Sequence, residues 1–208
     1  MCITTMYIVR HTQTRGNIEE RLQGRTDFEI TEEGKALISK LDDALKDIKF
    51  DKAYSSTSPR ALKTILPIAI RNNLDVIQLK DLCEMDFGDY DGKTWNEVYK
   101  INPELKQLQH KASKIVGIPN QESTEHVAER MYNCIVNIGN ENKGKTILIC
   151  SHGVSMEAFF RKIARKDKDW SVDKENFCLQ NANINIITFD SNLQKFNLSI
   201  LNSTEHLK

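Results

Sequence analysis

The sequence has no excess charge of either sign, since its 29 Lys and Arg residues are balanced by 29 Asp and Glu residues. A nucleic-acid-binding protein normally carries a basic excess, and a disordered chain combines a large net charge with few apolar residues. Here the hydrophobic fraction is 39%, as in ordinary globular proteins. The composition therefore excludes a disordered chain, and we expect no nucleic-acid partner.

Cysteine pairs and long apolar runs are also lacking. The five cysteines form an odd set without a C-x-x-C pair, so neither a disulfide framework nor a thiolate metal site is indicated. No apolar run approaches the roughly 18 residues that a membrane span needs, and the first residues lack the basic head and apolar stretch of a signal peptide. We therefore expect a soluble, cytoplasmic protein with reduced thiols and no membrane partner.

Strand and helix patterns alternate along the 208 residues, a length that suits one α/β domain. Buried central strands are predicted at 6–9 and 146–150, further strands at 50–54 and 76–79, and edge strands near 184–188 and 196–201. Helices are predicted to start at about Thr31, Ser58 and Ser123. Repeated β-α-β units imply an α/β fold with a mainly parallel central sheet and helices on both faces.

Residues 84–121 interrupt this alternation. The stretch is polar and punctuated by Gly and Pro, and Thr94 with Glu97 forms a capping box that predicts a short helix. We expect one domain over residues 1–208, in which residues 93–121 form a small cap of loops and short helices over the sheet.

The segment 139–146 satisfies the P-loop pattern G-x-x-x-x-G-K-[ST] letter for letter. A phosphate-binding P-loop must leave a strand and open a helix, so that its amide groups converge on the phosphates. This segment leaves a predicted helix and enters a predicted strand. We therefore interpret it as a helix end followed by a solvated turn, without a role in nucleotide binding.

Polar side chains follow three predicted strands at their carboxyl ends, where open α/β sheets bind their ligands. The first strand ends in Arg10 and His11, the second leads into the helix start that carries Arg60, and a third ends just before His152. Glu84 lies in the polar stretch and could face the same cleft. Taken singly, each of these five residues is more often structural than functional, so only their convergence indicates a site.

This mixture of side chains favours a phosphate group over a metal ion. Two guanidiniums would repel a divalent metal, and no H-x-x-x-H pair is present. Arginine forms bidentate, charge-assisted hydrogen bonds with phosphoryl oxygens. A neutral histidine could attack phosphorus, and a carboxylic acid could protonate the departing oxygen. Cys150 is a less favoured nucleophile, because its place inside an apolar run indicates a buried, inert thiol.

The order and spacing of these residues resemble the motifs of the histidine phosphatase superfamily, the phosphoglycerate-mutase-like proteins. The segment 10–17 is similar to the R-H-G-[EQ]-T-x-x-N signature of that family, and 22–25 to the loop that follows it. The segments 55–64, 84–92 and 151–153 resemble its S-S-x-x-x-R-A-x-x-T, E-x-x-F-G-x-x-[ED]-G and second histidine motifs. The resemblance covers essentially the whole chain, and the closing His206 and Leu207 are typical of the phosphatase branch.

The resemblance also implies a mechanism and a role for each site residue. His11 would be the nucleophile that forms a phosphohistidine, and Glu84 would act as general acid and then as base for water. The groups implied to bind the phosphoryl oxygens are Arg10, Arg60, His152, Asn17, the Gln23–Gly24 loop and the backbone N–H of Gly153. No metal and no other cofactor is implied.

The function that the resemblance implies is a metal-independent phosphomonoester phosphatase acting on a small phosphorylated metabolite. A phosphoglycerate-type mutase is the alternative enzyme, although family mutases carry a Trp before the Asn, where this chain has Gly16. Phosphoglycerate-like acids, sugar phosphates, a nucleotide-loop phosphate of cobalamin synthesis and phosphoprotein side chains are all compatible substrates.

One departure from the family pattern lies beside the predicted nucleophile, where Thr12 takes the place of a glycine. A β-branched residue would be strained if the site required positive φ at that position. We expect the backbone to tolerate Thr12. A non-catalytic binder of phosphorylated ligands is the alternative that this substitution raises.

Overall fold

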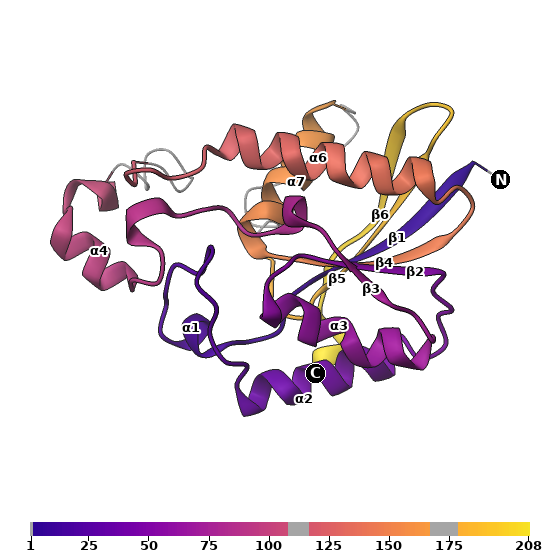
Figure 1. The fold of residues 1–208 in the computed structure, drawn as a ribbon, viewed down its shortest axis with the longest axis horizontal. Helices are drawn as coiled ribbons and strands as arrows, with labels where there is room; N and C mark the ends of the chain where they lie inside the picture. Colours follow the sequence, from indigo (N-terminus) through magenta and orange to yellow (C-terminus); the bar gives the residue numbers. More distant parts are fainter. Residues whose placement is uncertain (1, 108–116, 167–178) are drawn as a thin grey trace.

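A computed structural model describes residues 2–107, 117–166 and 179–208, in which six strands form one sheet with the order β3-β2-β4-β1-β5-β6. The strands are β1 (Ile3–Arg10), β2 (Lys52–Ser55), β3 (Val76–Gln78), β4 (Thr146–Ser151), β5 (Ile184–Asp190) and β6 (Lys195–Ser203). Strands β3, β2, β4 and β1 pair in parallel, whereas β5 pairs antiparallel with both β1 and β6. The predicted mainly parallel sheet is confirmed (Figure 1).

One strand assignment from the sequence is wrong. The segment near 184–188 was expected at an edge, but β5 lies between β1 and β6, and only β6 occupies that edge. Alternation of apolar residues reports which face of a strand is buried and carries no information about its two neighbours in the sheet. The turn after β5 returns the chain as β6, which supplies the outer partner.

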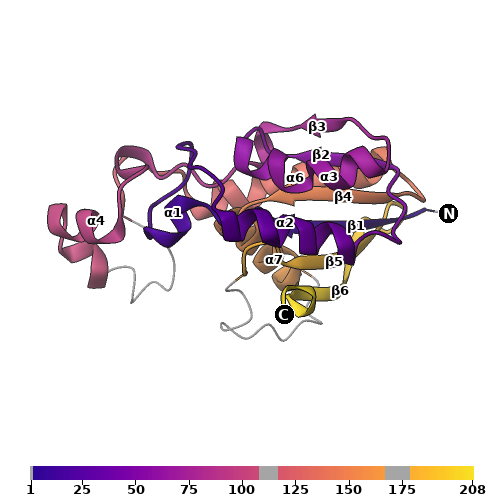
Figure 2. The same ribbon diagram turned by 90° about the horizontal axis from the view of Figure 1, so that it is seen from below.

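Helices cover both faces of the sheet, as predicted (Figures 1 and 2). Helices α2 (Glu32–Ala44) and α3 (Pro59–Arg71) lie on one face, and α6 (Thr124–Glu141) and α7 (Gly153–Lys166) lie on the other. The shorter helical elements are α1 (Arg15–Ile18), η1 (Lys80–Leu82), η2 (Gly88–Tyr90), α4 (Trp95–Ile101) and η4 (Glu205–Leu207). None of the helices in the described ranges is both long and apolar enough to span a membrane.

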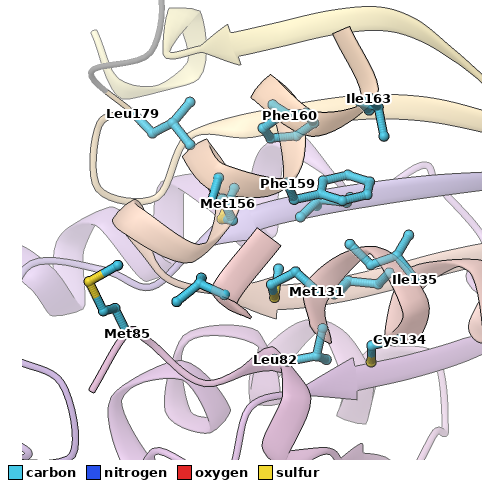
Figure 3. Close-up of a cluster of buried hydrophobic side chains, with 14 of the residues drawn as sticks. Leu82, Met85, Met131, Cys134, Ile135, Met156, Phe159, Phe160, Ile163 and Leu179 are labelled. Carbon is cyan, nitrogen blue, oxygen red and sulfur yellow. The ribbon is translucent and has the colours of Figure 1, made fainter. Parts of the chain in front are cut away.

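The central strands contain apolar runs, residues 6–9 in β1 and 147–150 in β4, because both of their faces are covered by helices. Ile8 of β1 and Ile149 of β4 belong to the core beneath α6 and α7, part of which Figure 3 shows. Val9 and Leu148, one residue away in each strand, belong to the separate core beneath α2 and α3. Since successive side chains of a strand point to opposite faces, a strand between two helical layers needs a continuous apolar run.

Helix starts follow the local capping chemistry in most places. The Thr31 hydroxyl accepts a hydrogen bond from Gly34 N, and the capping box of Thr94 and Glu97 forms as predicted. Ser58 precedes α3 but makes no side-chain capping bond, so Pro59, with its preset φ, marks this start.

The P-loop-like segment has the geometry expected of a turn. Helix α6 ends at Glu141, Gly144 adopts a positive φ of 77°, and β4 begins at Thr146. No helix follows the glycine, so the segment lacks the helix N-terminus on which a P-loop depends.

The predicted cap region is described for residues 93–107 and 117–121, while residues 108–116 lie outside the described part of the chain. Helix α4 lies with α1 beyond the carboxyl ends of the parallel strands (Figures 1 and 2). Backbone bonds join the segments that carry them: Leu22 N donates to Lys93 O over 2.9 Å, and Trp95 N donates to Glu20 O over 3.2 Å. These segments extend the molecule past the edge where the site residues collect.

Candidate active site

A cavity of about 250 Å³ opens at the carboxyl ends of the parallel strands. The register places Arg10 of β1 beside Ser151 of β4, so the residues that follow each strand meet at one edge. Six of the residues singled out from the sequence line this cavity: Arg10, His11, Asn17, Gln23, Glu84 and Gly153. The remaining wall is formed by Arg21, Leu22, Phe87, Trp95, Val154, Glu157 and Leu179.

His11 is held in a defined tautomer at the floor of the cavity. Its backbone N–H donates to Ser151 O over 3.0 Å, and its ring Nδ1 lies 2.7 Å from Thr12 O. A carbonyl oxygen only accepts hydrogen bonds, so Nδ1 carries the proton and Nε2 keeps its lone pair. Burial, followed by the charges of Arg10 and Arg60, holds the pKa of His11 well below its ordinary value. The ring is therefore neutral and nucleophilic near pH 7.

Thr12 fits its position without the strain that positive φ would cause. It is absent from the described non-glycine residues with positive φ. Its N–H donates to the Thr64 hydroxyl over 2.9 Å, and its own hydroxyl donates to Gly34 O over 2.7 Å. The side chain is thus bonded to the start of α2, and the backbone tolerates the replacement of glycine as expected.

Arg10 and Gly153 form a tightly packed corner of the cavity. The Arg10 Nη1 donates to Leu179 O over 2.5 Å. A Cβ placed on Gly153 would lie 3.2 Å from Arg10 Nε, closer than side chains normally approach. The glycine therefore lets the first turn of α7 lie directly against the guanidinium.

Arg60 lies behind the cavity lining and is fully buried. Its Nη1 donates to Asp27 Oδ1 over 2.8 Å, and its Nη2 donates to Gln23 O over 2.7 Å and to His152 Nδ1 over 3.1 Å. Its Nε–H is buried and has no hydrogen-bond partner among the described residues. A buried cationic donor without a partner is costly, and an anion bound nearby would satisfy it.

His152 is also fully buried, with its ring centroid 5.1 Å from that of His11. Because its Nδ1 accepts from Arg60, its Nε2 carries the proton and donates to the Ser56 hydroxyl over 2.7 Å. Burial and the charge of Arg60 lower its pKa well below the ordinary value. The structure thus joins both histidines and Arg60 in one buried group, although neither Arg60 nor His152 lines the cavity.

Glu84 lies at the N-terminus of α7. Its Oε1 accepts hydrogen bonds from Met85 N, Ser155 N and the Ser155 hydroxyl over 2.8, 2.9 and 3.0 Å, and its Oε2 accepts from Val154 N over 3.0 Å. The first N–H groups of a helix have no partner within the helix, so they are available to bind a side-chain oxygen. These bonds hold the carboxyl group at the cavity wall.

The loop that follows α1 contributes its residues in different ways. Asn17 Oδ1 accepts from Thr14 N over 3.0 Å, and Gln23 Oε1 accepts from the Thr14 hydroxyl over 2.6 Å, so both amides are fixed beside the cavity. Gly24 does not line the cavity, and its N–H donates to Asp91 Oδ1 over 2.6 Å. The structure therefore gives Gly24 a place in loop packing.

Two residues that support this site were missed from the sequence. The Asn181 side-chain amide donates to His11 O over 2.9 Å and to Thr12 O over 3.2 Å, while Ser155 holds Glu84. Neither belongs to a recognised motif, and each reaches its partner across a large separation in the chain. Only the buried polar character of Ser155 on an amphipathic helix could have drawn attention to it.

The described residues contain no group of three His, Cys, Asp or Glu side chains arranged to hold a metal ion. Cys150, the alternative nucleophile, is fully buried in the core beneath α2 and α3, and burial raises its thiol pKa strongly. The ionisable side chains that line the cavity are those of Arg10, His11, Arg21, Glu84 and Glu157.

Comparisons with known proteins identify the family and the fold that this chain resembles. A family profile described as "Histidine phosphatase superfamily (branch 1)" matches residues 6–202. Phosphoglycerate mutase-like protein 4 of Arabidopsis thaliana is 29% identical over 97% of this chain and 86% of its own. The structure of Bacillus stearothermophilus YhfR superposes with a TM-score of 0.86 at 26% identity, covering 99% of this chain and 100% of that one. A phosphoserine phosphatase from Entamoeba histolytica, solved with 3-phosphoglyceric acid, is 26% identical with a TM-score of 0.78, covering 99% and 100%.

Proposed function

The chain belongs to the histidine phosphatase superfamily, and from this premise we propose that it hydrolyses a small phosphate monoester through a phosphohistidine on His11. The observation that carries the proposal is the tautomer of this residue. The Nδ1 proton is held by Thr12 O, which leaves the lone pair on Nε2 of a neutral ring that lines the cavity. An in-line attack on phosphorus needs this lone pair at physiological pH.

The reaction divides into two transfers. The His11 Nε2 lone pair forms a bond to phosphorus while the bond from phosphorus to the alcohol oxygen breaks, and Glu84 in its acid form gives that oxygen a proton. Glu84 then accepts a proton from water as the water oxygen attacks phosphorus and the P–N bond breaks. The second step releases inorganic phosphate and restores both residues.

We propose that the hydrogen-bond donors around His11 bind the phosphoryl oxygens of the substrate. Arg10 lines the cavity and supplies a fixed positive charge, and Asn17 and Gln23 offer amides held by Thr14. The Gly153 N–H lies at the start of α7, where backbone donors favour an anion. Arg60 and His152 contribute from the buried layer, and the partnerless Nε–H of Arg60 supports its part in binding.

We assign the choice of alcohol to the outer wall and the cap segment 93–121. Leu22, Phe87, Trp95 and Leu179 are apolar, while Arg21 and Glu157 are charged. A cavity of about 250 Å³ accommodates a small ester. A relative whose structure contains 3-phosphoglyceric acid makes phosphorylated small acids the first class to test.

A phosphoglycerate mutase is the second candidate, and the similarity to a mutase-like protein is the observation that favours it. Its first half-reaction is the same, but the phosphoryl group returns to another hydroxyl. Family mutases carry a Trp at the position of Gly16. A Cβ at Gly16 would lie 2.5 Å from Gln23 Cδ and 2.7 Å from Phe28 Cδ2, so a larger side chain there would require these side chains to move. The glycine at this position therefore favours the phosphatase.

The test combines turnover with trapping of the intermediate. The protein is incubated with 4-nitrophenyl phosphate without a bisphosphorylated primer, and an alkaline denaturing quench is used to trap phosphoenzyme. We expect phosphate release and an acid-labile phosphoenzyme, both lost in His11→Ala. Turnover that depends on a primer would favour the mutase, and unchanged turnover in His11→Ala would contradict the nucleophile assignment.

A further inference from the structure

A buried ion pair lies directly behind the loop that carries Glu84. Arg130 projects from α6, and Glu122 precedes that helix in the chain. Arg130 Nε donates to Glu122 Oε1 over 2.6 Å, and its Nη2 donates to Oε2 over 2.9 Å, which makes the pair bidentate. The two side chains are only 10% and 8% exposed.

The other donors of this guanidinium all bind the backbone of the Glu84 loop. Arg130 Nη1 donates to Asp81 O over 2.7 Å and to Cys83 O over 2.8 Å, and Nη2 donates to Glu84 O over 3.0 Å. Together with the two bonds to Glu122, this uses the five N–H donors of an arginine. A lysine ammonium has three donors on one atom and could not reproduce this pattern.

Glu122 holds the far end of the same loop. Its Oε2 accepts from Asp86 N over 3.2 Å, and its own N–H donates to Asp86 O over 2.9 Å. Burial alone would raise the pKa of Glu122, but the hydrogen bonds and charge of Arg130 outweigh it, so this pKa is lowered. Glu122 is therefore ionised at neutral pH and remains a partner for Arg130.

The loop is thus fixed from two helices at once. The backbone from Asp81 to Asp86 is held by Arg130 and Glu122 at α6, while the Glu84 carboxyl group is held by Val154 N and Ser155 N at α7. A proton donor must stay within hydrogen-bond reach of the leaving oxygen, and a displacement of about 1 Å can cost roughly 100-fold in rate.

We propose that Arg130, locked by Glu122, is a positioning residue that acts on the reaction through Glu84. The inference rests on the proposed function, in which Glu84 protonates the leaving alcohol. Arg130 does not line the cavity, and its donors are engaged by Glu122 and the loop backbone, so it has no direct part in phosphoryl binding. A purely structural role would lower activity by the same factor for every substrate.

The experiment measures kcat/KM for a series of phosphate esters, from 4-nitrophenyl phosphate to an alkyl phosphate. Arg130→Met is expected to lose roughly 10- to 100-fold on the alkyl ester and much less on the nitrophenyl ester, because a good leaving group needs little protonation. Arg130→Lys should recover little of the kcat/KM that Arg130→Met loses on the alkyl ester, because lysine cannot reproduce the five hydrogen bonds. In the Glu84→Gln background, Arg130→Met should cost less than threefold more, since residues that act as a unit are not additive.

Arg71 provides a matched control. It also donates to one carboxylate, that of Asp42, and to two backbone carbonyls, Asp42 O over 3.1 Å and Leu45 O over 3.0 Å. It joins α3 to α2 and does not line the cavity. Arg71→Met should therefore leave the ratio of kcat/KM values along the series unchanged.

Two outcomes would overturn the proposal: an equal loss on every ester in Arg130→Met, or an additive loss in the Glu84→Gln background. If Arg130→Met does not fold, Glu122→Gln carries the same test, since it keeps the shape but weakens the hold on Arg130. Failure of the proposed function gives a different result, in which Glu84→Gln itself loses activity equally along the series and no phosphoenzyme is trapped.

Discussion

The floor and the outer wall of the cavity are built in different ways. The floor consists of His11 and of the buried layer behind it, which contains Arg60 and His152. These three residues are 3%, 0% and 0% exposed and are joined to one another or to the ends of β1 and β4. The outer wall includes Arg21, whose side chain is 28% exposed and lies between the carboxylates of Glu19 and Glu97. Charges on the floor are therefore far less screened by water than those on the wall.

We infer from this difference that the floor carries out the reaction, whereas the outer wall determines which phosphate ester is bound. Floor residues are fixed by buried hydrogen bonds, so the fold defines the tautomer and charge of His11. Arg21, Leu22 and Trp95 of the wall are carried by two loop segments, residues 20–22 and 92–95, that pair with each other through backbone hydrogen bonds. Substitutions on the floor should affect every phosphate ester, whereas substitutions on the wall should change one ester relative to another.

The largest effects on stability and on phosphate binding are expected for Arg60→Lys. Arg21→Lys makes the same replacement on the outer wall and serves as the comparison. Arg60→Lys leaves Gln23 O, Asp27 and His152 without a planar fork, so we expect a loss of about 3 kcal/mol in the free energy of unfolding. Phosphate, used as a competitive inhibitor, should bind roughly 10- to 100-fold more weakly. Arg21→Lys should change either quantity by less than about 1 kcal/mol.

Denaturant unfolding and the inhibition constant of inorganic phosphate measure these two effects. The comparison breaks down if Arg21→Lys weakens phosphate binding as much as Arg60→Lys does. In that case the exposed arginine would contribute as much to phosphoryl binding as the buried one.

A second effect follows from the two buried histidines. The pKa values of His11 and His152 are lowered in the folded protein, first by burial and then by nearby arginines, whereas an unfolded histidine titrates near about 6.5. Below that pH the unfolded chain binds protons that the folded chain does not. The resulting stability is present above about pH 6.5 and is lost as pH falls, by up to about 1.4 kcal/mol per pH unit for each histidine.

Denaturant titrations between about pH 7.5 and about pH 5.5, above the range where most carboxylates titrate, measure this slope. His152→Asn should make the free energy of unfolding less dependent on pH, whatever its effect on stability at pH 7.5. An unchanged slope would show that the buried floor does not exclude protons as its surroundings indicate.

The sequence was most informative where a strand ends. Apolar runs that stop at Arg10 and Ser151 locate the ends of β1 and β4, and parallel pairing then brings His11 and His152 together. Glu84 was included in the predicted site because residues 84–92 resemble a family motif, since its loop has no strand or helix pattern of its own. These predictions succeeded because each depends on local pattern and on one general property of parallel sheets.

The long-range contacts that position the site residues could not be predicted from local sequence patterns. Asn181 holds the backbone of His11 from a position 170 residues away, and Arg130 reaches the Glu84 loop from the middle of α6. A polar residue on an amphipathic helix predicts only which face it occupies. Its partner depends on how two helices and a loop pack, which periodicity does not specify.

The smallest effect is expected on the outer wall at Trp95, which lines the cavity and stacks on Tyr99 with ring centroids 5.5 Å apart. Trp95→Ala removes apolar contact with the alcohol portion, so KM should rise about 3- to 10-fold for the preferred ester while kcat changes little. Tyr99→Ala is the matched control, because that ring does not line the cavity and should affect KM less. Kinetics on a panel of phosphorylated acids and sugars measure the change. If Trp95→Ala instead lowered kcat equally for every ester, Trp95 would act with the floor, and substrate choice would have to reside elsewhere on the wall.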